Sequence, residues 1–411
     1  MDSLAESLRK IRKLAFVCSA AGKPVFCTGV NEESIADVMA TAQALVSVSQ
    51  ACTGTLRSLK SRGCTLCFLD KNPLTLVAVS HLKEPVLVLR MQLVLLHAQI
   101  VSLLTAKALA SIFDKHPGYD VRKLVAGSEH ILQNLFDSFS KTPGAMLGAY
   151  LSMAMEPRVR RDMSEAMRVA IENTGASFGI LVHDNMVVSH VGLEGSKSRL
   201  IHWDILLLLN FVKSNVSLRV SETMTSLCLP FFDENGNFFA YIRYLDNESE
   251  SFVVFLSDQP TSDVQLFQEG FRGVEDAWNS HIDHHACRLE QFLPDSVRHV
   301  EYHFIFKSST LFQYVWSGGE TVPSHLSVED ALVRYGQMRA GMFALDGESP
   351  QGPLQAFRLE DSGPTLFVGF ASSKAELFVC FEKEHVSQED AIQVAQSLRD
   401  VLLARSDILF S

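Results

Sequence analysis

Two groups of residues in this chain have the types and spacing of chemical sites. The first is Cys64 and Cys67, separated by two residues as in thiols that bind zinc or exchange disulfides. A zinc site needs a second pair of ligands, and a redox pair is normally placed at a helix start. The flanking residues instead predict a strand over Cys64–Leu69, on which a spacing of three sends the thiols to opposite faces. We therefore interpret both cysteines as ordinary core residues.

The second group is a small set of histidines, His281, His284 and His285. His281 and His285 have the i, i+4 spacing that places two imidazoles on one helix face, where they could hold a metal. The sequence has no Glu in an H-E-x-x-H arrangement, and Asp283 and Cys287 do not complete a ligand set. Exposed helix histidines are the simpler interpretation, so we expect no metal.

The common nucleotide-binding motifs are missing from the sequence. Gly22-Lys23 lacks the preceding glycine and the following Ser or Thr of a phosphate-binding loop. The sequence contains no G-x-G-x-x-G, and we expect no nucleophile elbow. We expect no catalytic residue, no cofactor and no bond-making activity. A hydrolase whose nucleophile and histidine meet only in the folded chain stays a rival hypothesis.

Composition narrows the class of protein. The 411 residues allow two to four domains, and the hydrophobic fraction of 47% is enough for large cores. The net charge of −11, without a long basic run, argues against nucleic acid as a ligand. Eight scattered cysteines indicate a reducing compartment. One small basic cluster is either a solvated helix end or a weak contact with an anionic membrane: Arg9, Lys10, Arg12 and Lys13.

Two apolar segments could be mistaken for membrane or targeting signals. The run Leu14–Ala20 is short for a signal peptide and reads equally well as a strand before a turn at Gly22. The segment Pro85–Thr105 is long enough to span a membrane, but four polar residues interrupt it. Their spacing leaves apolar stripes on two faces, which predicts a helix between a sheet and another helix. The polar residues are Arg90, Gln92, His97 and Gln99.

One pattern of elements occurs three times along the chain. Each copy reads as a strand hairpin, a helix, further strands and a closing helix, and the copies begin near Leu14, Ser177 and Val300. This predicts an α/β fold of the α+β type, with three tandem domains that each have an antiparallel-rich central sheet flanked by helices. The expected boundaries are 1–118 for the first domain, 119–172 for a helical connector packed on it, 173–292 for the second domain and 293–411 for the third.

The turns and caps of the first two copies can be placed from the sequence. Asn31 is a good N-cap for a helix that carries apolar residues at helical spacing through Cys52. Asp70–Pro73 is the expected turn between two strands, and Asp120 is expected to cap a single connector helix. In the second copy, Asp233–Asn237 has Asn-Gly at its centre and predicts a hairpin turn.

Extended blocks of sequence resemble the Mon family of vacuolar fusion proteins. The blocks include TLRSLKSRGCTLCFLDKNPLTLVAVS at Thr55–Ser80 and the run Gln99–Ser138, which begins QIVSLLTAKALASIFDKHPG. Three shorter blocks are similar to the opening hairpin, the second-copy helix and the central hairpin of that family: FVCSAAGKPVFCTG, IHWDILLLLNFVKS and CLPFFDENGNFFAYIRYLD. The likeness is good from about Leu14 to Asp258 and looser in the third copy.

The resemblance implies three longin domains and a specific activity. A Mon subunit pairs with a Ccz-like longin subunit, with or without a further subunit. Together they act as a guanine-nucleotide exchange factor for a late-endosomal or vacuolar Rab GTPase of the Rab-seven class. The first domains pair into a platform for the GTPase, while the other two enlarge the subunit interface and help contact with anionic membrane. The expected setting is the cytoplasm, with peripheral recruitment to late endosomes and vacuoles.

Family members often carry a long acidic N-terminal arm. This chain begins close to its first predicted strand, so regulation by such an arm is not expected. A subunit without its partner exposes an apolar patch, so we also expect poor solubility or self-association of the chain alone. The rival to an exchange factor is a longin-type adaptor or tether that binds a small GTPase or a coat without exchange activity.

Candidate contact residues lie in the first copy. The predicted helix Ile35–Cys52 has more apolar surface than one sheet covers, so partner-subunit pairing is placed there, with core packing as the alternative for part of the same surface. Its candidates are Ile35, Val38, Met39 and Leu45. Loops at element ends carry recognition, and they supply the candidates for the GTPase side, with solvated loop residues as the alternative: Arg57, Lys71 and Asn72.

Overall fold

The computed structural model divides the chain into two compact units, each described here by itself. The first unit contains residues 1–146, 228–236 and 332–340, and the second contains the remainder. The residues described by the structure are 12–19, 22–29, 32–52, 54–61, 63–116, 119–120, 122–193, 200–245, 250–260, 263–281, 289–294, 297, 301–343 and 355–411.

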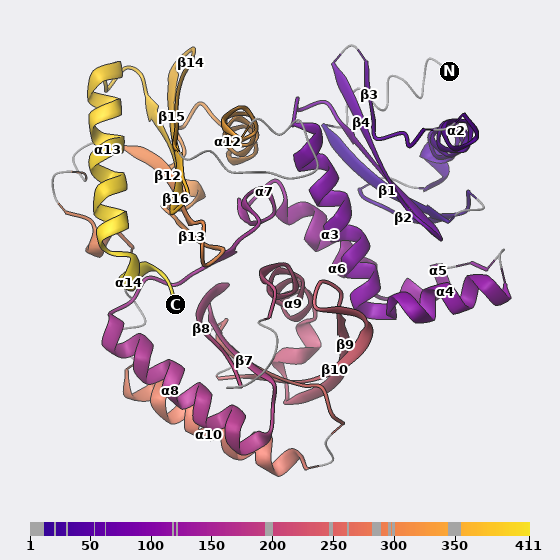
Figure 1. Ribbon diagram of the computed structural model, residues 1–411, viewed down its shortest axis with the longest axis horizontal. Helices are drawn as coiled ribbons and strands as arrows, with labels where there is room; N and C mark the ends of the chain where they lie inside the picture. Colours follow the sequence, from indigo (N-terminus) through magenta and orange to yellow (C-terminus); the bar gives the residue numbers. More distant parts are fainter. Residues whose placement is uncertain are drawn as a thin grey trace. The chain divides into compact units, whose positions relative to one another are not determined.

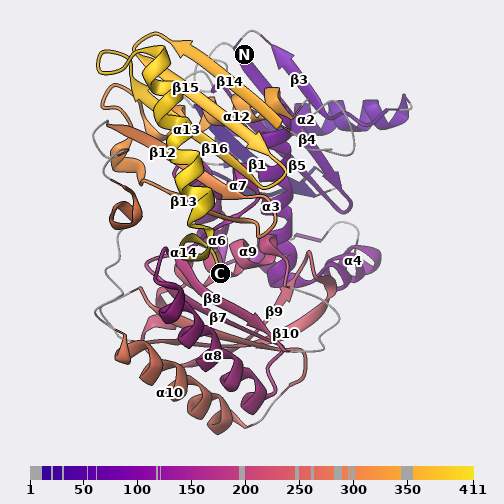
Figure 2. The ribbon, with the colours of Figure 1, turned by 60° about the vertical axis from the view of Figure 1, so that its left-hand side comes forward.

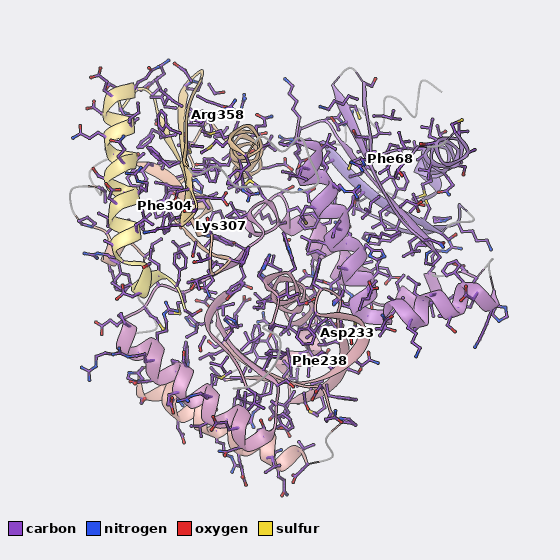
Figure 3. All side chains as sticks on the ribbon, in the orientation of Figure 1. Phe68, Asp233, Phe238, Phe304, Lys307 and Arg358 are labelled. Atoms are coloured by element: carbon purple, nitrogen blue, oxygen red, sulfur yellow. The ribbon has the colours of Figure 1, made fainter. Side chains whose placement is uncertain are left out.

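The first sheet has five antiparallel strands in the order β2-β1-β5-β4-β3. Phe68 on β4 packs in the core between this sheet and its first helix (Figure 3). The sequence analysis missed β3, because this edge strand is short and polar and most of its residues are exposed. The strands are β1 (Lys13–Ser19), β2 (Pro24–Cys27), β3 (Ser58–Ser61), β4 (Cys64–Lys71) and β5 (Leu74–Ser80).

Two long helices contact the first sheet, α2 (Glu32–Ala51) on β1 and β2, and α3 (Val86–Leu104) on β4 and β5. By length and composition α3 could cross a membrane, yet it packs on the sheet and on α6 (Glu129–Ser138), as Figure 1 shows. More than half of its apolar window is buried, which is typical of a core helix. The prediction of a helix between a sheet and another helix is confirmed.

The first half of the predicted connector consists of short helices. We expected one helix from Asp120, but α5 (Arg122–Val125) ends before Gly127, where φ is +85°, and α6 begins only at Glu129. A residue with positive φ interrupts a helix, and glycine adopts that conformation without strain. The helix before the connector is α4 (Ala106–Lys115), and α7 (Gly144–Leu147) follows α6 within it.

The second sheet repeats the strand order of the first, as β8-β7-β11-β10-β9. Two helices, α8 (Pro157–Thr174) and α10 (Val264–Ser280), lie side by side against it (Figure 1). The other elements are β7 (Phe178–His183), β8 (Met186–Gly192), α9 (His202–Ser214), η1 (Val216–Arg219), β9 (Thr223–Leu229), β10 (Asp233–Tyr244) and β11 (Phe252–Ser257).

Two details of this region differ from the sequence analysis. The connector was expected to pack on the first domain, but its helix α8 covers the second sheet, because Met163 and Met167 continue an apolar stripe that fits this core. The expected turn at Asp233–Asn237 is instead the start of β10. The chain turns before this segment, between the end of β9 at Leu229 and the start of β10 at Asp233. The Leu229 carbonyl accepts a hydrogen bond from the Phe232 amide at 3.0 Å.

The third sheet repeats the same order as β13-β12-β16-β15-β14 and gains a sixth strand, β6 (Tyr150–Leu151), which pairs parallel with β13. Figure 2 shows α13 lying along β15 and β16. The elements are η3 (Leu289–Phe292), β12 (Tyr302–Ser308), β13 (Gln313–Trp316), η4 (Gly319–Thr321), α12 (Val328–Met342), β14 (Gln355–Ser362), β15 (Thr365–Ser372), β16 (Ala375–Glu382), α13 (Gln388–Ala404) and α14 (Ser406–Leu409).

A short segment of the connector joins the second and third sheets within the second unit. The Tyr150 amide donates to the Phe312 carbonyl at 3.1 Å, and the Met153 amide donates to the Val187 carbonyl at 3.0 Å. The buried guanidinium of Arg160 donates to the carbonyls of Met153 at 2.6 Å and Val188 at 3.1 Å. These bonds link strands of both sheets through one stretch of backbone.

The three sheets therefore share one strand order, with one helix between their second and third strands and another after the fifth. This repeated, antiparallel-rich architecture confirms the predicted fold class. The middle of α12 is an addition that the sequence did not indicate: it belongs to the first unit, where Gln337 donates to the Lys83 carbonyl at 2.9 Å.

Candidate functional site

The two thiols of the C-x-x-C motif lie on opposite faces of β4. Cys64 packs with Phe68 beside α2, whereas the Cys67 sulfur lies 3.9 Å from the Val86 carbonyl on α3. Both are free cysteines. Burial raises the pKa of Cys64, and it raises that of Cys67 to about 11. Neither thiol is poised as a thiolate, so the interpretation as core residues is confirmed.

The histidine cluster can be followed only in part. The imidazole of His281 lies 3.2 Å from a carboxylate oxygen of Asp162 on α8. His284 and His285 lie outside the described residues. Within the described ranges, no three His, Cys, Asp or Glu side chains come together in a way that could hold a metal ion.

One arrangement of described residues has the composition of a hydrolytic triad. His183 Nδ1 lies 2.7 Å from Ser251 Oγ, and its Nε2 lies 3.4 Å from Asp184. Ser251, however, is fully buried, so its hydroxyl cannot meet a substrate. A nucleophile needs an accessible oxygen as well as a base. The contact therefore serves the packing of β7 against the segment before β11.

The three candidates for GTPase contact lie near one end of the first sheet. Arg57 is exposed, and its carbonyl accepts a hydrogen bond from the Phe68 amide at 2.9 Å. Lys71 ends β4, and Asn72 begins the turn to β5; both are exposed. At about 3.3 Å per strand residue, Lys71 lies roughly 10 Å along the sheet from Phe68. The fold thus brings these residues, which are separated along the chain, to the same end of the first sheet.

The partner-interface candidates separate onto two faces of α2. Met39 is 3% exposed and belongs to the core, so it is withdrawn as a contact residue. Val38 is partly buried against that core, and the side chain of Ile35 lies outside the described residues. Leu45 is 38% exposed, and its contact with a partner subunit stays a prediction. The core face repeats as Met39, Ala42 and Val46.

Sequence reasoning missed Val48, which is 61% exposed. Its spacing of three from Leu45 was a usable signal, since it continues a stripe next to the core face. From Val38 through Cys52 the helix has no charged residue. Its outward side carries small and apolar groups, a composition typical of surfaces that contact other proteins. The exposed residues, which we call the α2 outer face, are Ala40, Thr41, Ala44, Leu45, Ser47, Val48, Ala51 and Cys52.

Comparison with known proteins assigns the domains that carry these surfaces. Residues 13–135 match the family model described as the first longin domain of FUZ, MON1 and HPS1, and residues 174–269 match the second longin domain of the same proteins. The chain is 33% identical over 318 residues to the vacuolar fusion protein MON1 homolog A of Gallus gallus, which covers 75% of this chain and 56% of that protein. The chain belongs to the Mon family.

Other relatives extend the match across animals and plants. This Mon-family chain is 35% identical over 257 residues to the protein SAND of Takifugu rubripes, covering 62% of this chain and 49% of that one. It is 31% identical over 248 residues to a MON1 homolog of Oryza sativa subsp. japonica, covering 60% of this chain and 43% of that one. The chain spans about half the length of the curated relatives it matches.

The matched regions contain both candidate surfaces of this Mon-family chain. The α2 outer face and the turn after Lys71 fall within the first longin match. The third sheet lies beyond both matched ranges, yet it has the strand order of the other two. The longin-like strand order thus extends beyond the ranges that the two family models match.

Proposed function

We propose that this chain is one subunit of a guanine-nucleotide exchange factor for a Rab GTPase of the late endosome or vacuole. It would act with a Ccz-like longin subunit in endosome maturation, vesicle trafficking, autophagy and the fusion of vacuoles or lysosomes. Membership of a family named for vacuolar fusion supports a role in trafficking. The exchange activity, the partner and the particular Rab are the parts that we propose.

The α2 outer face is the observation that carries the proposal. It extends over about four helical turns without a charge. Exposed apolar side chains such as Leu45 and Val48 lose water contact when a second protein covers them, which favours association. A second longin subunit presenting a similar helix would cover this face. It would leave the end of the first sheet, near Lys71, available for the GTPase.

Exchange requires no nucleophile or proton shuttle on this chain. A factor that binds the nucleotide-free GTPase more tightly than the GDP-bound form accelerates GDP release through that difference in affinity. It does so by rearranging switch segments that Mg²⁺ and the phosphates otherwise order. Exposed polar groups such as Arg57, Lys71 and Asn72 are suited to contact such segments. Peripheral recruitment from the cytoplasm to anionic membrane completes the proposal.

The relative affinity for nucleotide states tests this function. The chain, co-purified with its longin partner, is titrated against a late-endosomal Rab in nucleotide-free, GDP-bound and GTP-bound forms. We expect the nucleotide-free form to bind most tightly, by at least about a hundredfold, which is about 2.7 kcal/mol. Equal affinity for the three forms, or preference for the GTP-bound form, would support an adaptor instead. Lys71→Glu is expected to weaken binding, whereas the matched charge reversal Lys374→Glu, on an exposed residue of the third domain, is the control.

A further inference from the structure

The second longin domain contains a polar pocket that the proposed function does not use. Its volume is about 550 Å³, and three arginines from three different elements line it. Arg219 comes from η1, Arg243 from β10 and Arg272 from α10. The chain as a whole has a net charge of −11, so a concave site with three guanidinium groups is distinctive.

Two of these arginines are held in place by aromatic rings. The guanidinium of Arg243 lies 4.2 Å from the centre of the Phe271 ring, and that of Arg219 lies 5.6 Å from the centre of the Tyr244 ring. Arg219 also donates to Glu250 at 2.8 Å. Stacking fixes the plane of a guanidinium while leaving its N–H groups free to donate outward. These two side chains are therefore oriented before any ligand arrives.

Arg272 is different, because nothing in the described part of the chain is paired with it. It is exposed on α10, four residues from Gln268, which also lines the pocket. An arginine has five N–H donors, and none of those of Arg272 has a partner among the described residues. It can turn toward a ligand in the pocket without breaking an existing bond.

The acidic side chains around the pocket leave donors of Arg243 and Arg272 available to a ligand. Glu222 already accepts hydrogen bonds from the Tyr241 hydroxyl at 2.7 Å and from the Gln268 amide at 2.6 Å. The bond from Tyr241 is the main cause of the lowered pKa of Glu222, so this carboxylate stays ionised and occupied at neutral pH. Its distance of 3.7 Å from Arg243 is an ion pair without a direct hydrogen bond. With Glu275, the lining carries three positive charges against two negative ones. Glu250, outside the lining, pairs with Arg219, so Arg243 and Arg272 are the donors left for a ligand.

We propose that this pocket binds a phosphate group, with Arg243 and Arg272 donating to its oxygens and Arg219 at the rim. The planar fork of a guanidinium matches the spacing of phosphate oxygens, and charge-assisted hydrogen bonds of this kind are among the stronger ones. The volume admits a phosphate with a small attached group such as a sugar or glycerol. The group could belong to a soluble metabolite or to a lipid head group, and Val220, 83% exposed at the rim, would favour the lipid.

Binding of inorganic phosphate and glycerol 3-phosphate to the full chain, followed by calorimetry and ³¹P line broadening, tests the site. We expect saturable binding that Arg272→Gln weakens by at least about tenfold. Arg243→Gln is expected to do the same, and urea unfolding shows whether that variant keeps its fold. Arg161→Gln on α8 removes the same charge from an exposed position outside the lining and is expected to bind as the unmodified chain does. Equal binding by Arg272→Gln and the unmodified chain, or equal weakening by Arg161→Gln, would overturn the proposal.

Flotation with vesicles separates the two sources of phosphate. Vesicles of phosphatidylcholine alone are compared with vesicles that also contain phosphatidic acid, which presents a phosphate monoester. A lipid source predicts flotation that both Arg272→Gln and Val220→Ser reduce. A soluble source predicts that Val220→Ser leaves glycerol 3-phosphate binding unchanged and that neither variant changes flotation. Either result supports the pocket. The proposal is contradicted if Arg272→Gln reduces neither flotation nor the binding of glycerol 3-phosphate.

Discussion

At the scale of single residues, a buried ion pair is the clearest departure from the sequence analysis. Lys13 was expected to belong to a basic cluster on a solvated helix end or against a membrane. It lies instead in β1, with its ammonium 2.7 Å from Glu84 and both side chains about 95% covered. Glu84 also accepts from Ser80 at 2.7 Å and from Gln92 on α3 at 3.2 Å. The pair therefore joins β1, the end of β5 and α3.

Removing one partner of this pair should be costly. Glu84→Gln leaves the Lys13 charge buried without a carboxylate, which we expect to lower the free energy of unfolding by about 3–5 kcal/mol. Urea unfolding followed by circular dichroism measures the change. The matched control is Glu165→Gln on α8, whose ion pair with Arg168 is exposed and should contribute less than about 1 kcal/mol. Equal effects of the two substitutions would contradict this account of Lys13.

Buried histidines should make the fold sensitive to acid. His303 on β12 is fully buried, and burial lowers its pKa from 6.5 to about 4. Between these values the unfolded chain binds a proton that the folded chain excludes, so stability falls as the pH drops from 6.5 toward 4. The loss amounts to about 3 kcal/mol for this residue.

The variant His303→Gln removes this titration. We expect its free energy of unfolding to fall by about 3 kcal/mol less between pH 7 and pH 4 than that of the unmodified chain. The matched control is His385→Gln, at an exposed histidine of the third domain. A pH dependence that is the same for both variants would show that His303 does not exclude the proton.

At the scale of elements, α2 has two faces that differ in burial. Its core face, which includes Met39, holds the helix on the first sheet, whereas the α2 outer face has no cover among the contacts described. The sequence showed that α2 has more apolar surface than a sheet needs. It could not show which apolar residue faces which way, because Met39 and Leu45 have the same chemical character and only packing distinguishes them.

The two faces predict opposite results. Val48→Glu should weaken binding to the longin partner by at least about tenfold while leaving the free energy of unfolding within about 0.5 kcal/mol. Met39→Ala should lower the free energy of unfolding by about 2–5 kcal/mol, because it leaves a cavity in the core. Val169→Glu, at a valine 46% exposed on α8, controls for the charge itself. Co-purification and urea unfolding measure the two quantities.

At the scale of the whole molecule, the threefold repeat could be predicted because each copy has local sequence patterns that indicate its strands, helices and turns. Strands such as Leu14–Ser19 and helices such as Pro85–Thr105 have strong periodicity, turns or caps, and these elements occur where expected. The predictions that were wrong concern elements whose position depends on tertiary packing. The polar strand β3 forms because β4 pairs with it. The helix α8 packs on the second sheet instead of the first domain because its methionines fit the core there.

The candidate site was predictable to a similar extent. The exposed positions of Arg57, Lys71 and Asn72 followed from loop chemistry, and the fold brings them to one edge through strand pairing. The arginine pocket could not be found in the sequence, because Arg219, Arg243 and Arg272 are far apart along the chain and have no motif in common. Only the folding of η1, β10 and α10 assembles it.

The release of labelled GDP from a late-endosomal Rab tests the central claim most directly. The chain is purified with its Ccz-like longin partner, and the release rate is measured with the complex, with each subunit alone and with the Val48→Glu complex. We predict that the complex accelerates release by at least about a hundredfold, which corresponds to about 2.7 kcal/mol of barrier, and that neither subunit alone does so. Unchanged release with an intact complex, across the Rab proteins of the endosome and vacuole, would contradict the account.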